Sequence, residues 1–480
     1  MKATEKIKRK IYNKIGVIVN KVGQNEAKFT DNLDTAVTEG IPELLREAGA
    51  EGTVLLRNDN VLPLKKDDIL SVFGRVQYDY MYVGYGSGGD VIKPYTVNLI
   101  EGLENSDINY NKELASIYEN WCKKNPPDHG FWGHWPHYYE EMSIETADIK
   151  KAAEKSTVAA VVIGRSAGED RENYLTEGSY FLTEAEKSLI KRVSEAFEKT
   201  IIILNTGSIM DMSWEKEILK NKGAIMYVWQ SGMESGNSVA DVLSGKKEPS
   251  GRLTDTIAES YSDYPCSDDF GEKEYNNYTE DIFVGYRYFE TFAKDKVLYP
   301  FGFGLGYSEF NREFVKANLE NDIVSITVKA TNISDYCGKD VLQLYASQPQ
   351  GKLGKPAKVL CGFEKTNALK NGESQEATIS FPLYAIASYD DSGKSGHKSC
   401  YVLEGGEYSF YLGGNARDCE KVWSFTLSET RVIEELKEAS APQHSFERMI
   451  AKEENGKTTY DFENVPTSTE DLRKVILKNL

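Results

Sequence analysis

The stretch VAAVVIGRSAGEDREN, at positions 158–173, joins an apolar run to a charged turn. Its first six residues are all apolar, as in a strand that is covered on both faces of a parallel sheet. The helical pattern LTEAEKSLIKRVSEAFEK follows at 182–199. Together they predict a strand followed by a helix, with the charged turn at the carboxyl end of the strand.

The same alternation of apolar runs and helical patterns extends over residues 40–310. It predicts a mainly parallel sheet with helices on both faces, that is, an α/β sandwich domain. The expected strands are EGTVLLRN (51–58), ILSVFGR (69–75), VAAVVIGR (158–165), TIIILNTGS (200–208) and GAIMYVWQS (223–231), and the expected helices are PELLREAGA (42–50), IETADIKKAAEKS (144–156), the segment after Leu182 and GNSVADVLSG (236–245).

The pattern changes after residue 310. Residues 311–430 contain short runs in which apolar and polar residues alternate, such as IVSITVKATN (323–332) and EYSFYLGG (407–414), separated by turn signals. Such spacing predicts an all-β sandwich of the fibronectin-III or immunoglobulin type. Residues 1–39 are expected to form an amphipathic helical segment, and the charged residues 431–480 a linker or strap.

Composition narrows the class of protein. The chain of 480 residues has a formal net charge of −18, which argues against nucleic acid as a partner. No apolar run is long enough for a membrane span, and no membrane partner is expected. The six cysteines are scattered without metal-ligand spacing, which predicts a reduced, cytoplasmic protein. Homo-oligomerisation is left open.

The turn GRSAGEDREN (164–173) allows two interpretations. Asp170 and Arg171 can pair and leave Glu169 as the odd carboxyl, which suits a general acid beside a leaving oxygen. A solvated turn held by salt bridges explains the same residues equally well. From the residues alone, both interpretations stand.

Other segments also have a structural and a functional interpretation. In DHGFWGHWPHYYEEM (128–142), Trp132 and Trp135 could stack on a sugar or fill a small apolar core, and the three histidines match no strong metal template. The glycine-rich GYGSGGD (84–90) could hold an anion or form a tight turn, but it lacks the lysine of a phosphate-binding loop. Glu234, just before an expected helix, fits a structural role best.

A set of ordered motifs resembles glycoside hydrolase family three, the β-glucosidase family. The resemblance covers roughly residues 40–430 and implies the carboxyl-side half of that family, an α/β sandwich followed by a fibronectin-III-like domain. The motifs are EAGAEGTVLLRNDNVLPL (47–64), GSGGDV (86–91), GEDRENY (168–174), LNTGSIMDMSW (204–214), WQSGMESGNSVADVLSGKKEPSGRL (229–253), DIFVGYRYFETF (281–292) and YPFGFGLGYSEF (299–310).

The resemblance implies a retaining hydrolase of β-glycosides that uses two carboxylates, one as nucleophile and one as acid and then base. It implies that Glu169 is the acid/base, because the family carries it on a loop similar to GEDR. Here the residue between the Glu and the Asp-Arg pair is missing. Asp170 and Arg171 are expected to support Glu169, and Trp132 and Trp135 to contact substrate. No metal or organic cofactor is implied.

The family's nucleophile is an Asp on a (β/α)8 barrel, in a motif like SDW. No stretch of about 250 residues remains for a barrel, and the SDW-like string Ser334–Tyr336 falls in a turn of the expected β sandwich. The resemblance therefore suggests the first half of a member with reversed domain order, whose barrel is supplied in cis or in trans. A non-catalytic carbohydrate-binding or scaffold protein, and a nucleotide-binding protein, are the alternatives.

Overall fold

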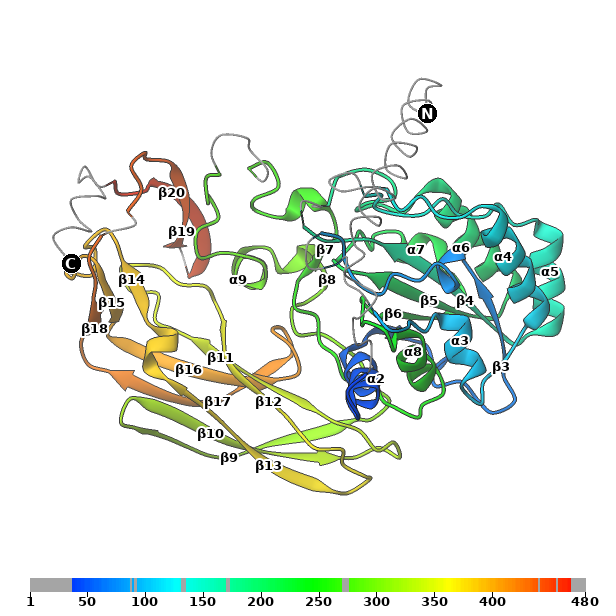
Figure 1. Cartoon of the computed structure of the whole chain (residues 1–480). Coiled ribbons are helices and arrows are strands. Elements are labelled where there is room, and N and C mark those ends of the chain that lie inside the picture. The colour runs from blue at the N-terminus through cyan, green and yellow to red at the C-terminus, as the bar shows by residue number, and fades with distance from the viewer. Residues whose placement is uncertain are drawn as a thin grey trace. The chain divides into compact units, whose positions relative to one another are not determined.

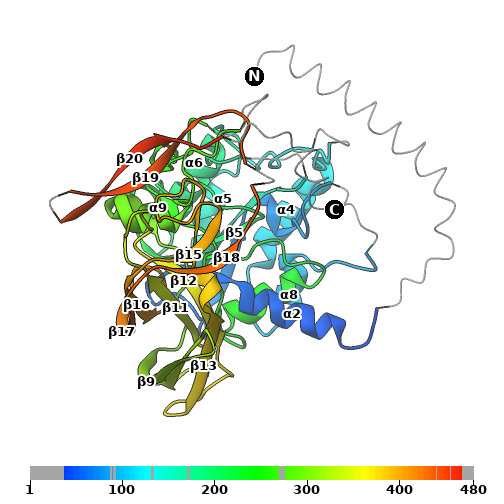
Figure 2. The same cartoon turned by 90° about the vertical axis from the view of Figure 1, so that its left-hand side faces the viewer.

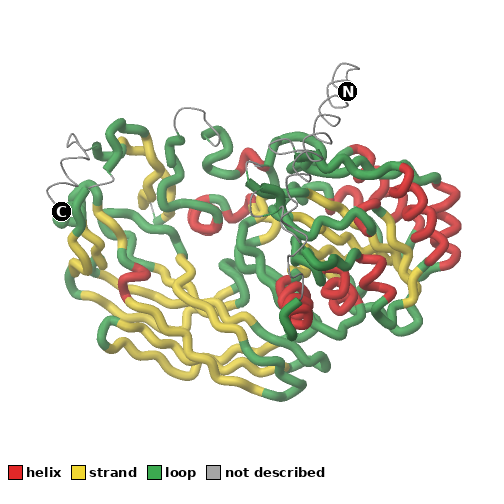
Figure 3. Tube along the Cα trace, in the orientation of Figure 1, coloured by secondary structure: helices red, strands yellow, loops and turns green. Residues whose placement is uncertain are grey.

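The computed structural model describes residues 37–86, 89, 93–130, 135–169, 173–269, 276–438, 441–454 and 456–467. The chain divides into two compact units. The first contains the described residues up to Gly251 together with Leu305–Tyr307, and the second contains Arg252–Gly304 and the described residues from Ser308 onward. Figure 3 shows that nearly all the longer helices belong to the first unit, whereas the second consists mainly of strands.

A six-stranded sheet forms the centre of the first unit (Figure 1). Its order is β1-β6-β5-β4-β2-β3; β1 runs antiparallel to β6, and the other neighbours are parallel. This is a doubly wound arrangement with one antiparallel strand added at an edge. The strands are β1 (Val54–Asn58), β2 (Ile69–Phe73), β3 (Asn109–Tyr110), β4 (Val158–Arg165), β5 (Lys199–Thr206) and β6 (Lys222–Tyr227).

Helices cover both faces of this sheet. On one face α8 contacts α2 and α3; on the other, α6 contacts α5, α7 and the sheet, and α4 packs against β2. Side chains of β4 alternate between the two layers, so all eight of its residues are buried. The helices are α2 (Ile41–Gly52), α3 (Leu99–Glu104), α4 (Lys112–Lys124), α5 (Thr146–Lys155), α6 (Glu184–Ala196), α7 (Glu215–Ile218) and α8 (Ser235–Leu243), with a 3-10 turn at Arg75–Gln77.

Two antiparallel sheets form the body of the second unit. One has the order β13-β10-β9 and the other β12-β11-β16-β17. Their inner faces share one apolar core. The strands are β9 (Phe310–Glu320), β10 (Ile323–Asn332), β11 (Val341–Ser347), β12 (Val359–Lys365), β13 (Ser374–Pro382), β16 (Gly406–Gly413) and β17 (Cys419–Leu427).

The period-two pattern explains why these strands have one covered face. In β10, Val324, Ile326 and Val328 are fully buried. On its other face, the hydroxyl groups of Ser325 and Thr327 lie 2.8 and 2.9 Å from those of their partners on β13. Cross-strand pairs of this kind stabilise antiparallel sheets.

Shorter elements complete the second unit. Figure 2 shows β19 and β20 as a long paired hairpin, beside which α9 lies. The remaining strands form a three-stranded sheet in the order β14-β15-β18 and a pair between β7 and β8. The elements are β7 (Ile257–Ala258), α9 (Tyr286–Phe292), β8 (Val297–Tyr299), β14 (Ser388–Asp390), β15 (Cys400–Leu403), β18 (Arg431–Glu435), β19 (Glu447–Glu454) and β20 (Lys457–Asn464), with 3-10 turns at Tyr261–Asp263, Lys294–Lys296 and Leu383–Ile386.

The predicted fold class is confirmed: a mainly parallel α/β sandwich is followed by an all-β sandwich. The small strand β3 and the helices α3 and α4 were not among the expected elements. The segment 431–480, expected as a linker or strap, contains β18, β19 and β20. Contacts also place residues 252–304 in the second unit, whereas the expected first domain extends to residue 310. The helical segment expected at 1–39 lies outside the described residues, apart from 37–39.

Candidate active site

The loop that follows β4 lies at the topological switch point of the sheet. From β2 the chain crosses to β3 on one side, then passes back to β4 on the other side of β2. In open parallel sheets, ligands bind outside the carboxyl ends of the two strands that flank such a reversal. The loops after β2 and β4 are therefore where the fold favours a binding site.

Arg165, the last residue of β4, belongs to the core and not to the charged turn. Two of its nitrogens donate to the Glu186 carboxylate at 2.7 Å each, and its Nε donates to the Ser179 carbonyl at 3.0 Å. Both members of the ion pair are about 95% buried. Glu186 also accepts the Thr183 N–H in the capping box of α6. The pair thus fixes the end of β4 to the start of α6.

The backbone of the next residues holds Glu169 in place. The Tyr85 N–H donates to the Ala167 carbonyl at 2.8 Å, and the Glu169 N–H donates to the Tyr85 carbonyl at 3.1 Å. These two bonds form a short parallel bridge between the loop after β2 and the loop after β4. Ser166 is anchored in the same way, because its N–H donates to the His137 carbonyl at 2.8 Å. Glu169 itself is exposed, so its position is set without burying it.

Two glycines of GYGSGGD allow this close approach. A Cβ atom at Gly84 would lie 2.4 Å from the Ala167 carbonyl oxygen, and one at Gly86 would lie 2.4 Å from the Cβ of Glu169. Gly86 also has a φ of 103°, a conformation that side chains other than glycine rarely adopt. The glycines therefore serve to bring the two loops together.

An aromatic platform adjoins the bridge. The ring of Tyr85 stacks on Trp135 with a centroid distance of 5.6 Å and an interplanar angle of 7°. The hydroxyl groups of Tyr85 and Tyr139 lie 3.0 Å apart. Stacked rings present a flat apolar face with a polar edge, a surface that suits a sugar ring. Tyr85 thus contacts Trp135 through its ring and Glu169 through its backbone.

The ends of β5 and β6 join the same region. Asn205, fully buried, accepts the Met81 N–H at 2.8 Å and donates to the carbonyls of Met81 and Trp229 at 2.9 and 2.6 Å. The Gln230 side chain donates to the Arg165 carbonyl at 3.2 Å. The loops at the carboxyl ends of β2, β4, β5 and β6, which are neighbours in the sheet, are therefore linked to one another around Glu169.

Glu141, close to the aromatic platform, is a carboxyl with a raised pKa. Glu141 accepts the N–H groups of Arg75 and Met142 at 2.9 and 2.8 Å. Burial raises the pKa of Glu141 to about 7, against the effect of these hydrogen bonds. The Arg75 guanidinium lies over the rings of Trp121 and Tyr139, 5.0 and 5.7 Å from their centroids. The guanidinium thus packs on the Tyr139 ring, whose hydroxyl lies next to that of Tyr85.

The structure brings together two of the residues predicted to form the site. Glu169 and Trp135 both contact Tyr85. Trp132, Asp170 and Arg171 lie outside the described residues. Glu234 is buried at the start of α8, where it accepts from the Tyr95 hydroxyl at 2.5 Å and the Asn237 side chain at 2.6 Å. These contacts agree with the structural role expected for Glu234.

The histidines of the aromatic segment face different neighbours. The ring of His129 meets the edge of Tyr139, and the ring of His137 meets that of Tyr174. His134 is not among the described residues. In the described part of the chain, no three His, Cys, Asp or Glu side chains are grouped so as to hold a metal ion. None of the helices described there is long and apolar enough to cross a membrane.

Tyr85 and Gly86 are the residues that reasoning from the sequence missed. Their signal was present in GYGSGGD, where the glycines pointed to a close backbone approach. What that loop approaches depends on the order of strands in the sheet, which the local pattern does not contain. The Arg165–Glu186 pair also had a local signal, since Thr183 and Glu186 have the spacing of a capping box.

Comparison with known families matches both units. The model for the glycosyl hydrolase family 3 C-terminal domain matches residues 53–307, more than half of the chain. The model for the fibronectin type III-like domain matches residues 340–416. These matches agree with the α/β sandwich and the β sandwich of the structure.

Individual relatives are β-glucosidases. The chain is 44% identical to a β-glucosidase of Ruminococcus albus over 430 residues, 89% of this chain and 45% of that protein. It is 39% identical to β-glucosidase A of Butyrivibrio fibrisolvens over 454 residues, 85% of this chain and 54% of the other. The chain thus spans about half the length of the curated relatives it matches.

Solved structures show the same likeness. A β-glucosidase from Paenibacillus barengoltzii superposes with a TM-score of 0.90 and 44% identity, covering 93% of this chain and 50% of that one. β-Glucosidase 3B from Thermotoga neapolitana, in complex with glucose, gives 0.72 and 34%, covering 81% and 54%. In both cases the likeness extends over most of this chain.

Proposed function

Since the chain belongs to glycosyl hydrolase family 3, we propose that it forms part of a retaining β-glucosidase-like hydrolase and supplies its general acid/base, Glu169. The observation that carries this proposal is the position of Glu169. It is an exposed carboxyl at the switch point of the sheet, held by backbone hydrogen bonds to Tyr85, whose ring stacks on Trp135.

In this mechanism Glu169 acts twice. First, its protonated carboxyl donates a proton to the glycosidic oxygen as the bond to the leaving sugar breaks. Then its carboxylate takes a proton from the water that attacks the glycosyl-enzyme intermediate. Both steps need the carboxyl close to the oxygen that gains or loses the proton. The bridge to Tyr85 helps to hold Glu169 in such a position.

The leaving sugar is proposed to rest on the aromatic platform. Trp135 presents a partly exposed ring there, stacked on Tyr85. By the resemblance to the family, Trp132, Asp170 and Arg171 are proposed to complete the contacts to substrate. The acid/base and the platform would then be coupled through one residue, Tyr85.

The second carboxylate is proposed to lie on a (β/α)8 barrel supplied in cis or in trans. Retaining enzymes hold the nucleophile about 5–5.5 Å from the acid/base. Asp335, in the SDW-like string, lies in the loop after β10 and accepts a hydrogen bond from the Asn371 side chain at 3.1 Å. That contact suits a turn. Relatives of about twice the length support a further catalytic domain.

Replacement of Glu169 tests the proposal. In the enzyme assembled with its barrel, Glu169→Gln should lower turnover of cellobiose about 10²–10⁴-fold, because the leaving sugar needs protonation. Aryl glucosides with good leaving groups should be affected less, and added azide should restore part of their turnover. Glu177→Gln, an exposed carboxyl in the same loop region, is the matched control. Unchanged hydrolysis of cellobiose by Glu169→Gln would refute the assignment.

The alternative is a carbohydrate-binding or scaffold protein without catalysis. The stacked rings of Tyr85 and Trp135 favour it, because such a surface would bind a sugar without any proton transfer. This alternative predicts that the chain binds cellobiose and that no activity arises when a barrel half is co-expressed. Activity that depends on Glu169 excludes it.

A further inference from the structure

Two adjoining cavities lie in the second unit beside the hairpin β19–β20. Their volumes are about 300 and 470 Å³, and both are lined by Tyr389, Asp391 and Tyr401. Each volume falls within the range of about 300–1,000 Å³ that is usual for ligand sites. The two cavities therefore adjoin each other at these three residues.

The shared wall is an ordered aromatic surface. Tyr389 on β14 and Tyr401 on β15 are directly opposite each other across the strand pair, and their ring centroids are 5.3 Å apart. Tyr389 remains 39% exposed. A cross-strand pair of rings on two hydrogen-bonded strands has little freedom to move. The site therefore has a preformed apolar face.

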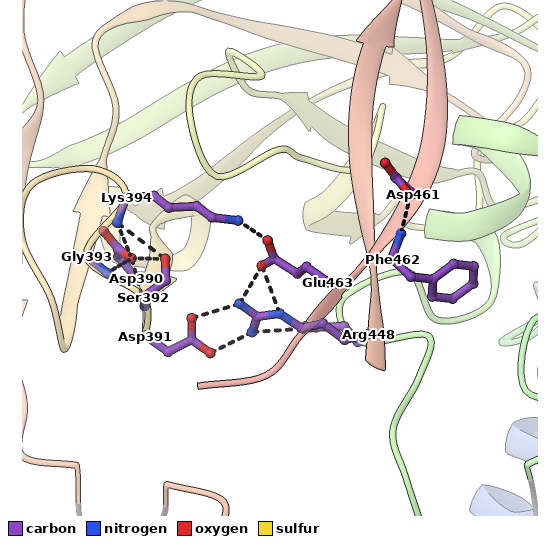
Figure 4. A network of polar contacts seen from close by, with 10 residues as sticks. Asp390, Asp391, Ser392, Gly393, Lys394, Arg448, Asp461, Phe462 and Glu463 are labelled. Atoms are coloured by element: carbon purple, nitrogen blue, oxygen red, sulfur yellow. Dashed lines mark hydrogen bonds and ion pairs between the residues drawn. The ribbon is translucent and has the colours of Figure 1, made fainter. Parts of the chain in front are cut away.

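The larger cavity is also lined by a network of polar side chains, which Figure 4 shows. Arg448 on β19 binds the Asp391 carboxylate through two nitrogens, at 2.5 and 2.9 Å, and donates to Glu463 at 3.0 Å. Lys394 pairs with the other oxygen of Glu463. Asp281 lies 3.2 Å from the same guanidinium. These contacts fix several donors and acceptors along the cavity wall.

The lining charges are of both signs: Asp391 lines both cavities, so the two together have six cationic and four anionic side chains. The larger cavity is lined by four cationic and three anionic side chains, and the smaller by two of each. Four of the six cations, Arg448, Lys394, Lys398 and Lys355, are held in ion pairs with carboxylates. The wall therefore offers interleaved donors and acceptors to hydroxyl groups. The side chains are Arg287, Lys355, Lys394, Arg448, Asp281, Asp391 and Glu463 in the larger cavity, and Lys398, Lys437, Asp391 and Glu438 in the smaller.

We propose that the two adjoining cavities act as one site that binds a neutral carbohydrate of one or two rings, in addition to the substrate contacts of the Glu169 loop. The sugar stacks on Tyr389 and Tyr401, and its hydroxyl groups exchange hydrogen bonds with the fixed side chains around Arg448. The proposal does not depend on the catalytic role of Glu169, since it rests only on the second unit.

Titration of the full chain with cellobiose tests this site. The Trp135→Ala chain serves as background, so that sugar binding on the platform of the first unit does not mask the result. In that background, calorimetry should still detect binding. Tyr389→Ala and Tyr401→Ala should each weaken it about tenfold, a change of about 1.4 kcal/mol.

Two further variants control for indirect effects. Tyr389→Phe keeps the ring and should bind within about twofold of the Trp135→Ala background. Tyr336→Ala removes a tyrosine that is 44% exposed but lines neither cavity, and it should leave binding unchanged. Thermal unfolding identifies any variant that fails to fold; if one of the two alanine variants does, the other carries the test.

Two results would overturn the proposal. One is the absence of cellobiose binding in the Trp135→Ala background up to the solubility limit of the sugar. The other is tight binding of glucuronate or inorganic phosphate without binding of cellobiose, which would show an anion site centred on the lining cations.

Discussion

Glu169 in the first unit and Arg448 in the second are held in opposite ways. Glu169 is positioned by its backbone, through the bridge to Tyr85, and the residue remains exposed. Arg448 is positioned by its side chain, which binds the carboxylates of Asp391 and Glu463. The hydrogen bonds to Asp391 and the nearby Asp281 outweigh the effect of burial and raise the pKa of Arg448.

This difference distinguishes residues whose replacement tests reactivity from residues whose replacement tests stability. The backbone hydrogen bonds that hold the Glu169 loop remain when the Glu169 carboxyl is replaced, so the replacement reports mainly on chemistry. A side chain that neutralises buried charges cannot be removed without leaving those charges uncompensated. Arg165, four residues before Glu169, belongs to the second kind.

Arg165→Ala should have the largest effect on stability. It leaves the Glu186 carboxylate buried without its partner, and we expect the free energy of unfolding to fall by about 3–5 kcal/mol in urea titrations. Arg57→Ala is the matched control, because Arg57 is also held in ion pairs, with Asp59 and Glu215, but keeps a quarter of its side chain exposed. Equal losses for the two variants would show that burial of the ion pair does not set the cost of breaking it.

Gly86→Ala should affect activity more than stability. The added Cβ meets the Cβ of Glu169 and displaces it, and a displacement near 1 Å can cost about 100-fold in rate. We expect a fall of that size in kcat of the assembled enzyme on cellobiose. Gly40→Ala, also at positive φ but with no atom within 4 Å of the added Cβ, should keep normal kcat. A similar loss in both would point to backbone strain instead.

Arg448→Ala should destabilise the second unit by about 2 kcal/mol, because charged hydrogen bonds to Asp391 and Glu463 are lost. Hydrogen exchange should accelerate in β19 and β20, since this side chain joins the hairpin to the turn after β14. Arg431→Ala removes an exposed pair with Asp322 and should change stability within error. Unaltered exchange in the hairpin of Arg448→Ala would show that the network does not hold it.

The smallest effect at neutral pH is expected from Glu141, because most of its contribution to stability is lost there. Its pKa is about 7 in the folded chain and 4.5 without the fold, so the folded state binds this proton more tightly. Its contribution to stability is therefore complete below pH 4.5 and is lost as the pH rises through 7. Over this range we expect the unfolding free energy of the original chain to fall by about 3 kcal/mol more than that of Glu141→Gln, since one pKa unit corresponds to about 1.4 kcal/mol. Parallel slopes would refute the raised pKa.

Local patterns were sufficient for the fold class and for the strands that carry it. The apolar runs ending at Phe73, Arg165 and Thr206 are long enough to be recognised without tertiary information. The short strand Asn109–Tyr110 was missed because two residues show no periodicity. The strands of 431–464 were missed because their charged side chains stand on largely exposed faces.

The candidate site was only partly predictable, for a related reason. Glu169 and Trp135 were selected from their chemical types and from motifs, each within its own segment. Tyr85, which links them, could not be selected in this way, because a tyrosine between two glycines has many ordinary roles. Its importance comes from strand order, which places the loop after β2 beside the loop after β4.

The amino-acid sequence by itself determined the two kinds of sheet, the family resemblance and the choice of Glu169 as the candidate acid. These follow from periodicity, residue type and motif order along the chain. Only the tertiary structure decided that Arg165 pairs with Glu186, that Gly86 makes room for Glu169, and that Tyr389, Tyr401 and Arg448 line one cavity. The physical reason is that these contacts join residues far apart in the chain, and their partners are chosen by topology and packing.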